Sequence, residues 1–208
     1  MTDKKNFYNI FSTDSKPFGF TLGEWTAKWW QWIITIPKVN NPGNDLIGEH
    51  CGINQEGPVW FLAGTFENIQ KAERNCIIPK EKAILIPVIN TEKSYIEFPE
   101  LKDESALRTR AKEAIDRVTK KICIINGEEI QDLHNFRIQS PLFDLTYPQD
   151  NIYDLKPNKT QAVSDGFWVL FKPSEDQKKY KVEFGGESRC QKDQTEFETY
   201  VKYNIDLA

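Results

Sequence analysis

The side chains best suited to chemistry gather in one short stretch between residues 44 and 56. It contains two carboxylates, an imidazole, a thiol and a carboxamide, namely Asp45, Glu49, His50, Cys51 and Gln55. An imidazole nitrogen combined with carboxylate oxygens suits a divalent metal ion or acid–base chemistry. The predicted metal ligands are His50, Asp45, Glu49 and the more distant Glu92. The alternative is that these residues cap and solvate their own loop.

Three further polar residues stand at the ends of predicted buried strands, where loops converge and binding sites often form. They are Arg74, Asn90 and Asp165. Each is a candidate for lining a pocket. The alternative is that strand-end Asn and Asp residues fix turns, and Asp165-Gly166 is an ordinary turn dipeptide.

Tryptophans dominate the first predicted helix. Trp25, Trp29 and Ile33 share one stripe at helical spacing, which indicates a core face. Trp30 points away from that stripe and is the candidate for an exposed platform that stacks on a sugar ring. An exposed Trp30 is equally consistent with a protein contact.

The four cysteines, Cys51, Cys76, Cys123 and Cys190, form no Cys-x-x-Cys zinc or redox motif. Cys51 and Cys76 flank the same predicted strand region, so they are the candidate disulfide pair. The alternative is that both remain thiols, as in a reducing compartment.

Familiar catalytic strings are missing from the sequence. There is no Gly-x-Ser-x-Gly elbow, His-Glu-x-x-His helix, phosphate-binding loop or dinucleotide-binding turn. His50 and His134 are the only histidines, so one chain cannot build a three-histidine zinc site. Many common enzyme classes are thereby excluded, and the identity of any cofactor stays open.

The composition of the chain limits the classes of partner that we expect. The 208 residues include 27 basic and 31 acidic side chains, for a net charge of −4, and the basic ones are scattered. Without a basic stripe, nucleic acid and membrane surfaces are not expected partners. The longest apolar run, residues 29–36, is too short to span a bilayer. The polar N-terminus predicts a cytoplasmic protein, or an exported one if the chain is a mature or trimmed form.

The elements that must position these residues are mainly strands. A capping box at Thr21 and Glu24 predicts a helix over residues 22–36, and a second helix is expected over residues 103–120. Nine or ten short strands are expected around them, including a hairpin at Asn126-Gly127 and a bulge or edge at Pro87. The predicted fold is a mainly β (α+β), antiparallel β-sandwich, jelly-roll-like, with two flanking helices. Residues 1–208 form one domain with an irregular arm at 1–20.

Two strings, Trp-Trp-Gln-Trp at 29–32 and Gly-Pro-Val-Trp-Phe-Leu-Ala-Gly at 57–64, resemble a family of microbial proteins without an assigned activity. The resemblance continues through residues 87–90, 140–143, 165–168 and 184–186. It implies a protein of the exported kind, whereas the polar N-terminus indicates the cytoplasm. It supplies no mechanism.

Abundant aromatics and turn-rich loops without a catalytic set favour a noncatalytic binding module. Its expected partner is a small polar ligand, a glycan or another protein. One alternative is a metal-assisted or acid–base enzyme that uses the loop at residues 45–55. The other is a structural or assembly subunit with an exposed apolar patch, and the oligomeric state is open.

Overall fold

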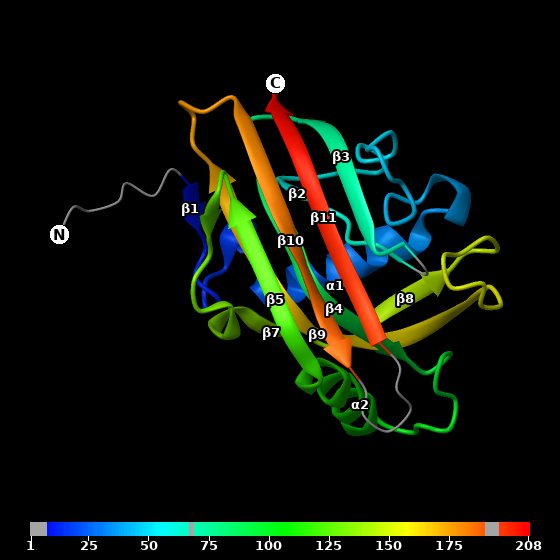
Figure 1. Cartoon of the computed structure of the whole chain (residues 1–208). Coiled ribbons are helices and arrows are strands. Elements are labelled where there is room, and N and C mark those ends of the chain that lie inside the picture. The colour runs from blue at the N-terminus through cyan, green and yellow to red at the C-terminus, as the bar shows by residue number, and fades with distance from the viewer. Residues whose placement is uncertain (1–7, 67–68, 190–195) are drawn as a thin grey trace.

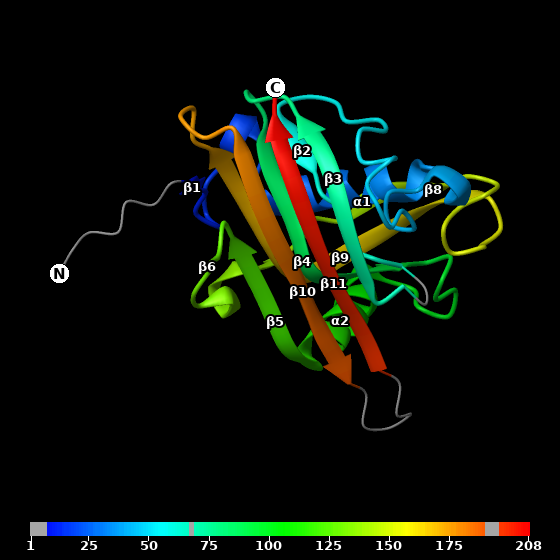
Figure 2. The ribbon, with the colours of Figure 1, turned by 45° about the horizontal axis from the view of Figure 1, so that its top comes forward.

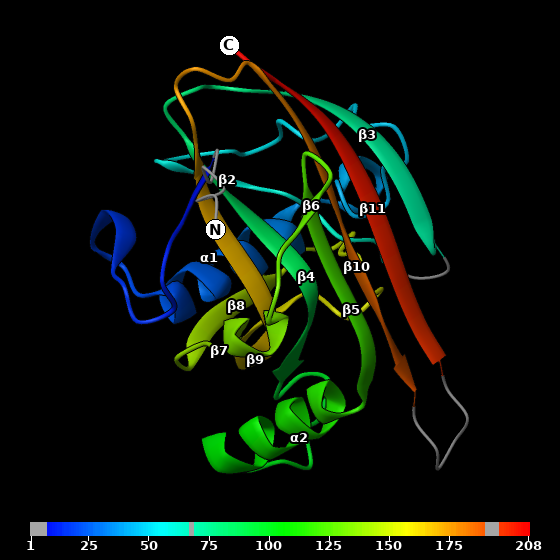
Figure 3. The ribbon, with the colours of Figure 1, turned by 60° about the vertical axis from the view of Figure 1, so that its left-hand side comes forward.

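Two stacked β-sheets form the centre of the molecule, with one helix on the outer face of the first sheet and another at one end (Figure 1; Figure 3). The computed structural model describes residues 8–66, 69–189 and 196–208. The mainly β, two-sheet architecture with two α-helices that the sequence predicts is therefore confirmed.

The first sheet has six strands organised around the longest one, β9. In spatial order β1, β9, β4 and β2 are neighbours, and β7 and β8 also pair with β9. The strands are β1 (Tyr8–Ile10), β2 (Val59–Phe61), β4 (Ala83–Ser94), β7 (Arg137–Gln139), β8 (Phe143–Tyr147) and β9 (Asn158–Pro173). Most pairs are antiparallel, but β2 runs parallel to β4.

The second sheet has five strands in the order β3, β11, β10, β5 and β6. Their bounds are β3 (Lys71–Ile78), β5 (Val118–Ile125), β6 (Glu128–Glu129), β10 (Lys179–Arg189) and β11 (Glu196–Leu207). β3 runs parallel to β11, whereas the other pairs are antiparallel. Both sheets are thus mixed, which departs from the wholly antiparallel sandwich predicted from the sequence.

Both predicted helices are present. α1 (Leu22–Thr35) begins at the expected capping box, in which Thr21 and Glu24 satisfy each other's backbone amides. α2 (Glu104–Asp116) is capped by the Asp103 side chain. It ends earlier than predicted because β5 already begins at Val118. Short 3₁₀ turns are η1 (Pro17–Gly19), η2 (Lys38–Asn40) and η3 (Leu133–Phe136).

Two hydrophobic cores lie on opposite faces of the first sheet. One fills the space between the sheets, and the other packs α1 against the outer face. β4 contributes to both, which explains why its residues 83–89 are buried without alternation. A helix with apolar residues on most of its sides is expected to be buried on most of its sides. α1 has this composition and is buried accordingly.

The middle of β4 loses its neighbour on one side. β2 pairs only with residues 83–85 of β4, and the chain then leaves the sheet. The β4–β9 register shifts between Pro87 and Ile89, so the bulge or edge predicted at Pro87 is confirmed. Proline suits this edge because it has no amide hydrogen to donate. The space beside this edge is occupied by the side chains described below.

Smaller expectations have mixed outcomes. The hairpin at Asn126-Gly127 is confirmed, since both residues adopt positive φ angles. The arm predicted as irregular contains β1 and η1, while residues 1–7 lie outside the described part of the chain. Among the helices of the described residues, none combines the length and apolar character needed to cross a membrane.

Candidate functional site

A cavity of about 380 Å³ lies beside the unpaired edge of β4. It extends from α1, past the loop after β2, to α2 and the far ends of β10 and β11. Its volume is at the lower end of the range of small-molecule sites, about 300–1,000 Å³. It is lined by Trp29, Trp30, Gly64, Thr65, Phe66, Pro87, Ile89, Asn90, Thr91, Ala114, Ile115, Val118, Tyr153, Ser188, Phe197 and Thr199.

Aromatic rings form one side of the cavity. Trp29 and Trp30 meet edge to face with ring centroids 5.0 Å apart. Trp30 contacts Phe66 at 6.2 Å, and Phe66 contacts Tyr153 at 5.8 Å, both edge to face. Each ring is thus held by its neighbour, which gives the cavity a fixed apolar wall.

Four polar side chains on the wall, those of Trp30, Asn90, Tyr153 and Ser188, have no protein partner within the described residues. The Trp30 Nε1–H is buried and makes no hydrogen bond. Neither the Asn90 carboxamide nor the Tyr153 hydroxyl bonds to another residue in the described part of the chain. Burial raises the pKa of the Tyr153 hydroxyl well above its usual value, so it keeps its proton. Trp30, Asn90 and Tyr153 are therefore lining residues whose donors are not satisfied by the protein.

Other polar groups of the wall are already paired. The hydroxyls of Thr65 and Thr199 lie 2.8 Å apart and hydrogen-bond each other. Within the described residues, the lining contains no Asp, Glu, Lys or Arg. An uncharged, largely apolar occupant with oxygen acceptors would suit this surface, whereas a charged one would be desolvated without a counter-ion.

A buried acidic cluster lies behind Tyr153. Tyr147, whose ring centroid is 6.4 Å from that of Tyr153, places its hydroxyl 3.3 Å from a carboxylate oxygen of Glu92. Ser94 joins the cluster, with its hydroxyl 3.2 Å from that of Tyr147 and 2.9 Å from the Glu97 carboxylate. Burial, and then the Glu97 charge, raise the pKa of Glu92 well above its usual value, although Lys93 and Ser94 oppose the shift.

This cluster predicts a pH dependence of stability. Glu92 keeps its proton in the folded protein at pH values where the unfolded chain, with a Glu pKa of about 4.3, has released it. Its contribution to stability is therefore complete below that pH and declines as the pH rises towards the folded-state pKa. Glu92→Gln should flatten this decline, which is at most about 1.4 kcal/mol per pH unit.

The measurement is urea unfolding of wild type and variant between about pH 5 and pH 8. Glu100→Gln, which removes an exposed carboxylate from the segment that follows β4, is the control and should keep the wild-type slope. Equal slopes for wild type and Glu92→Gln would show that Glu92 ionises normally.

Two of the predicted binding residues, Trp30 and Asn90, meet in the cavity. The exposed stacking platform predicted for Trp30 is wrong, because its side chain is only 3% exposed. Phe66 covers the side of α1 that the stripe of Trp25 and Trp29 leaves open. Asn90 lies inside β4, opposite Gly166 on β9, and not at a strand end.

The loop at residues 44–56 is built around structural bonds. The Asp45 carboxylate accepts the backbone amides of Ile47, Gly48 and His50 at 3.0, 2.9 and 2.7 Å. Burial alone would raise the pKa of Asp45, but these amides outweigh it and lower the pKa. Gln55 binds the backbone of Phe61 through both ends of its carboxamide. Asp45 and Gln55 therefore follow the alternative reading, in which polar residues satisfy their own loop.

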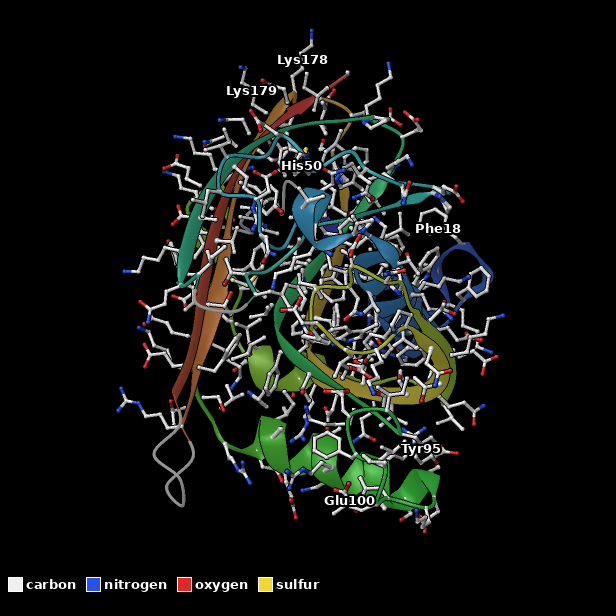
Figure 4. All side chains as sticks on the ribbon, turned by 90° about the vertical axis from the view of Figure 1, so that its right-hand side faces the viewer. Phe18, His50, Tyr95, Glu100, Lys178 and Lys179 are labelled. Carbon is white, nitrogen blue, oxygen red and sulfur yellow. The ribbon has the colours of Figure 1, made fainter. Side chains whose placement is uncertain are left out.

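The predicted metal ligands are not brought together. Among the described residues, no three His, Cys, Asp or Glu side chains form a group that could hold a metal ion. Figure 4 shows His50 at the end of the molecule opposite α2, whereas Tyr95, three residues after Glu92, packs near α2. Glu49 is exposed on the surface. The set of His50, Asp45, Glu49 and Glu92 fails because Glu92 lies on β4, away from the loop that carries the other three, and the Asp45 carboxylate is already bound to backbone amides of that loop.

Arg74 and Asp165 are buried but do not line the cavity. The Arg74 guanidinium donates to backbone carbonyls, among them those of Asp45 and Ala63. Asp165 lies in the middle of β9, where it pairs with Arg137 at 2.8 Å and accepts a bond from Gln139 at 3.0 Å. Both side chains stabilise connections between elements, so neither the turn nor the pocket interpretation describes them.

Sequence reasoning missed most of the cavity wall. Tyr153 belongs to a polar stretch without a helix or strand pattern, and Phe66 follows a short strand in a segment without a recognisable pattern. Ile89, Ile115 and Val118 look like ordinary core residues. No local signal distinguishes them, because the wall is assembled from segments far apart in the sequence.

Comparisons of the chain with protein-family models, with curated proteins and with solved structures found no match.

Proposed function

We propose that this protein is a noncatalytic binding module for a small, uncharged and mainly apolar molecule that carries at least one hydrogen-bond acceptor. The observation that carries the proposal is the cavity wall, which combines Trp30, Phe66 and Tyr153 with unpartnered donors. A buried donor without a partner costs free energy. A hydrogen-bond acceptor on the ligand would pair with such a donor and remove this cost. The site would therefore favour ligands that carry an acceptor.

This proposal narrows the partner predicted from the sequence. A small polar ligand or a glycan would bring many hydroxyl groups into a wall that is mostly apolar. The donors at Trp30, Asn90 and Tyr153 suffice for one or two acceptors only. The sandwich offers no catalytic pair on this wall within the described residues, so a binding role is favoured over a reaction. The jelly-roll-like connectivity suggested by the sequence stays a prediction.

The test is a titration with prodan, an uncharged naphthyl ketone whose emission depends on the polarity of its surroundings. The wild-type protein should bind it saturably at about one molecule per chain, with a blue-shifted emission. Ala114→Phe, which places a ring in the cavity from α2, should weaken binding by about tenfold or more, equal to about 1.4 kcal/mol.

Ala106→Phe is the matched control. Ala106 is also partly buried on α2 but does not line the cavity, so this variant should bind prodan as the wild type does. Circular dichroism of both variants checks that they fold. A wild-type protein that does not saturate with prodan, or a folded Ala114→Phe variant with unchanged affinity, would refute the proposal.

A further inference from the structure

The sulfur of Cys51 lies against the exposed edge of β3, beside Cys76. Figure 2 shows β3 at the outer edge of the second sheet. The loop that carries Cys51 is attached to this edge, because the Asn75 amide donates to the Ile47 carbonyl at 2.9 Å. The Cys51 thiol donates to the Asn75 carbonyl, with the sulfur 3.8 Å from the oxygen. Cys51 thus contacts the strand at the residue directly before Cys76.

Cys51 packs against the core cluster that contains Cys76, and the surroundings of the two thiols differ. Cys51 is partly exposed, whereas Cys76 is 4% exposed and faces the core between the sheets. The nearby Cys76 thiol lowers the pKa of the Cys51 thiol, and the Arg74 charge and the Ile77 amide act in the same direction against burial and Asp45. The nearby Cys51 thiol, together with burial, raises the pKa of Cys76.

The difference in exposure and pKa suits Cys51 and Cys76 to different roles in a reactive thiol pair. The accessible thiol with the lower pKa is the one that reacts as a thiolate. The buried neighbour stays protonated and is shielded from solvent, and it directly follows Asn75, whose carbonyl the first sulfur contacts. Cys123, which is 0% exposed and whose pKa is raised by burial alone, has no such neighbour among the described residues and is a built-in reference.

We propose that Cys51 and Cys76 form a two-cysteine site that reacts with hydroperoxides. The Cys51 thiolate attacks the peroxide oxygen, so an S–O bond forms, the O–O bond breaks, and the leaving oxygen takes up a proton. The Cys76 sulfur then attacks the Cys51 sulfenic acid, an S–S bond forms, and water leaves with the Cys76 proton. Two thiols are oxidised to a disulfide and one hydroperoxide is reduced. The site is independent of the cavity and of the proposed function.

The experiment uses hydrogen peroxide on the full chain in a Cys190→Ser background, followed by alkylation of remaining thiols and peptide mapping by mass spectrometry. Cys51 and Cys76 should be lost together, as one intramolecular disulfide, about tenfold faster than Cys123 is oxidised. In the Cys76→Ser variant, Cys51 should stop at a sulfenic acid that dimedone traps. In the Cys51→Ser variant, Cys76 should stay alkylatable for as long as Cys123.

Circular dichroism establishes that both serine variants are folded. The proposal is overturned if Cys51 reacts no faster than Cys123. It is equally overturned if Cys51 is oxidised while Cys76 remains a thiol, or if Cys51 bridges only to a second molecule. Removal of the cavity by Ala114→Phe should leave the rate of disulfide formation unchanged, so failure of the ligand proposal and failure of this one can be told apart.

Discussion

Arg74→Met should lower the free energy of unfolding by about 3–5 kcal/mol, because it leaves several buried acceptors without a donor and each such loss costs about 1–3 kcal/mol. The guanidinium is 0% exposed and donates to the Asp45 carbonyl at 2.6 Å, the Ala63 carbonyl at 2.5 Å and the Gly64 carbonyl at 3.1 Å. It also donates to the Tyr203 hydroxyl at 2.8 Å. Methionine fills similar space but leaves these acceptors without a donor.

Chemical denaturation monitored by tryptophan fluorescence measures this loss. Arg117→Met, which alters an exposed arginine after α2, should change stability by less than about 0.5 kcal/mol. Arg74→Lys should fall between the two, because an ammonium keeps the charge but cannot reproduce the planar fork. If Arg74→Met were as stable as Arg117→Met, the carbonyl network would contribute nothing net to folding.

The second large effect is expected at Trp29. Its side chain is 1% exposed, its Nε1–H donates to the Leu62 carbonyl at 2.7 Å, and its ring meets Trp168 edge to face at 5.3 Å. Trp29→Ala should therefore cost about 3–5 kcal/mol in thermal or urea unfolding. The loss combines removed apolar contacts with an acceptor left unpaired.

Two comparisons separate these contributions. Trp29→Phe retains a ring but removes the N–H, so it should cost about 1–3 kcal/mol through the unpaired Leu62 carbonyl and the smaller volume. Phe18→Ala truncates an aromatic side chain that is 43% exposed and should cost clearly less than either. A Trp29→Ala variant with wild-type stability would mean that α1 is not anchored through this ring.

Elements with a strong local pattern were predictable from the sequence. The capping box and the repeated tryptophans indicate α1. The strict alternation of apolar and polar residues indicates β11. The sequence predicts that α2 continues to residue 120, whereas the helix ends at Asp116. The prediction is wrong at this end because no glycine or proline directly follows Asp116 to stop the helix. The helix stops where β5 begins pairing with β10, which is a tertiary event.

The strand β3 escaped prediction for a specific reason. Its residues alternate between exposed and buried, but three of its four buried positions, Ala72, Arg74 and Cys76, are a small, a charged and a sulfur-containing residue. Pattern recognition expects large apolar residues at such positions. The start of β9 lacks a strand pattern for a related reason, since residues 158–161 are polar and mostly exposed.

The candidate site was predictable only in fragments. Trp30 and Asn90 were singled out, but for an exposed platform and a strand end, and they meet in a cavity that neither pattern implied. The disulfide predicted between Cys51 and Cys76 is not formed in the structure, because both are free cysteines, although the Cys51 sulfur lies against the carbonyl of the residue before Cys76. The metal hypothesis is wrong because closeness in the sequence does not show whether side chains converge on one point in space.

The position of β11 has a consequence for how the chain folds while the ribosome makes it. β11 lies between β3 and β10, and β3 has no other strand neighbour in the described structure. Arg74 likewise cannot form its hydrogen bond with Tyr203 until that residue, 129 positions further along the chain, has been synthesised. At about 5–20 residues per second, most of the chain emerges before the second sheet can close. The apolar inner faces of the nascent protein therefore stay open to chaperones until the last strand leaves the exit tunnel.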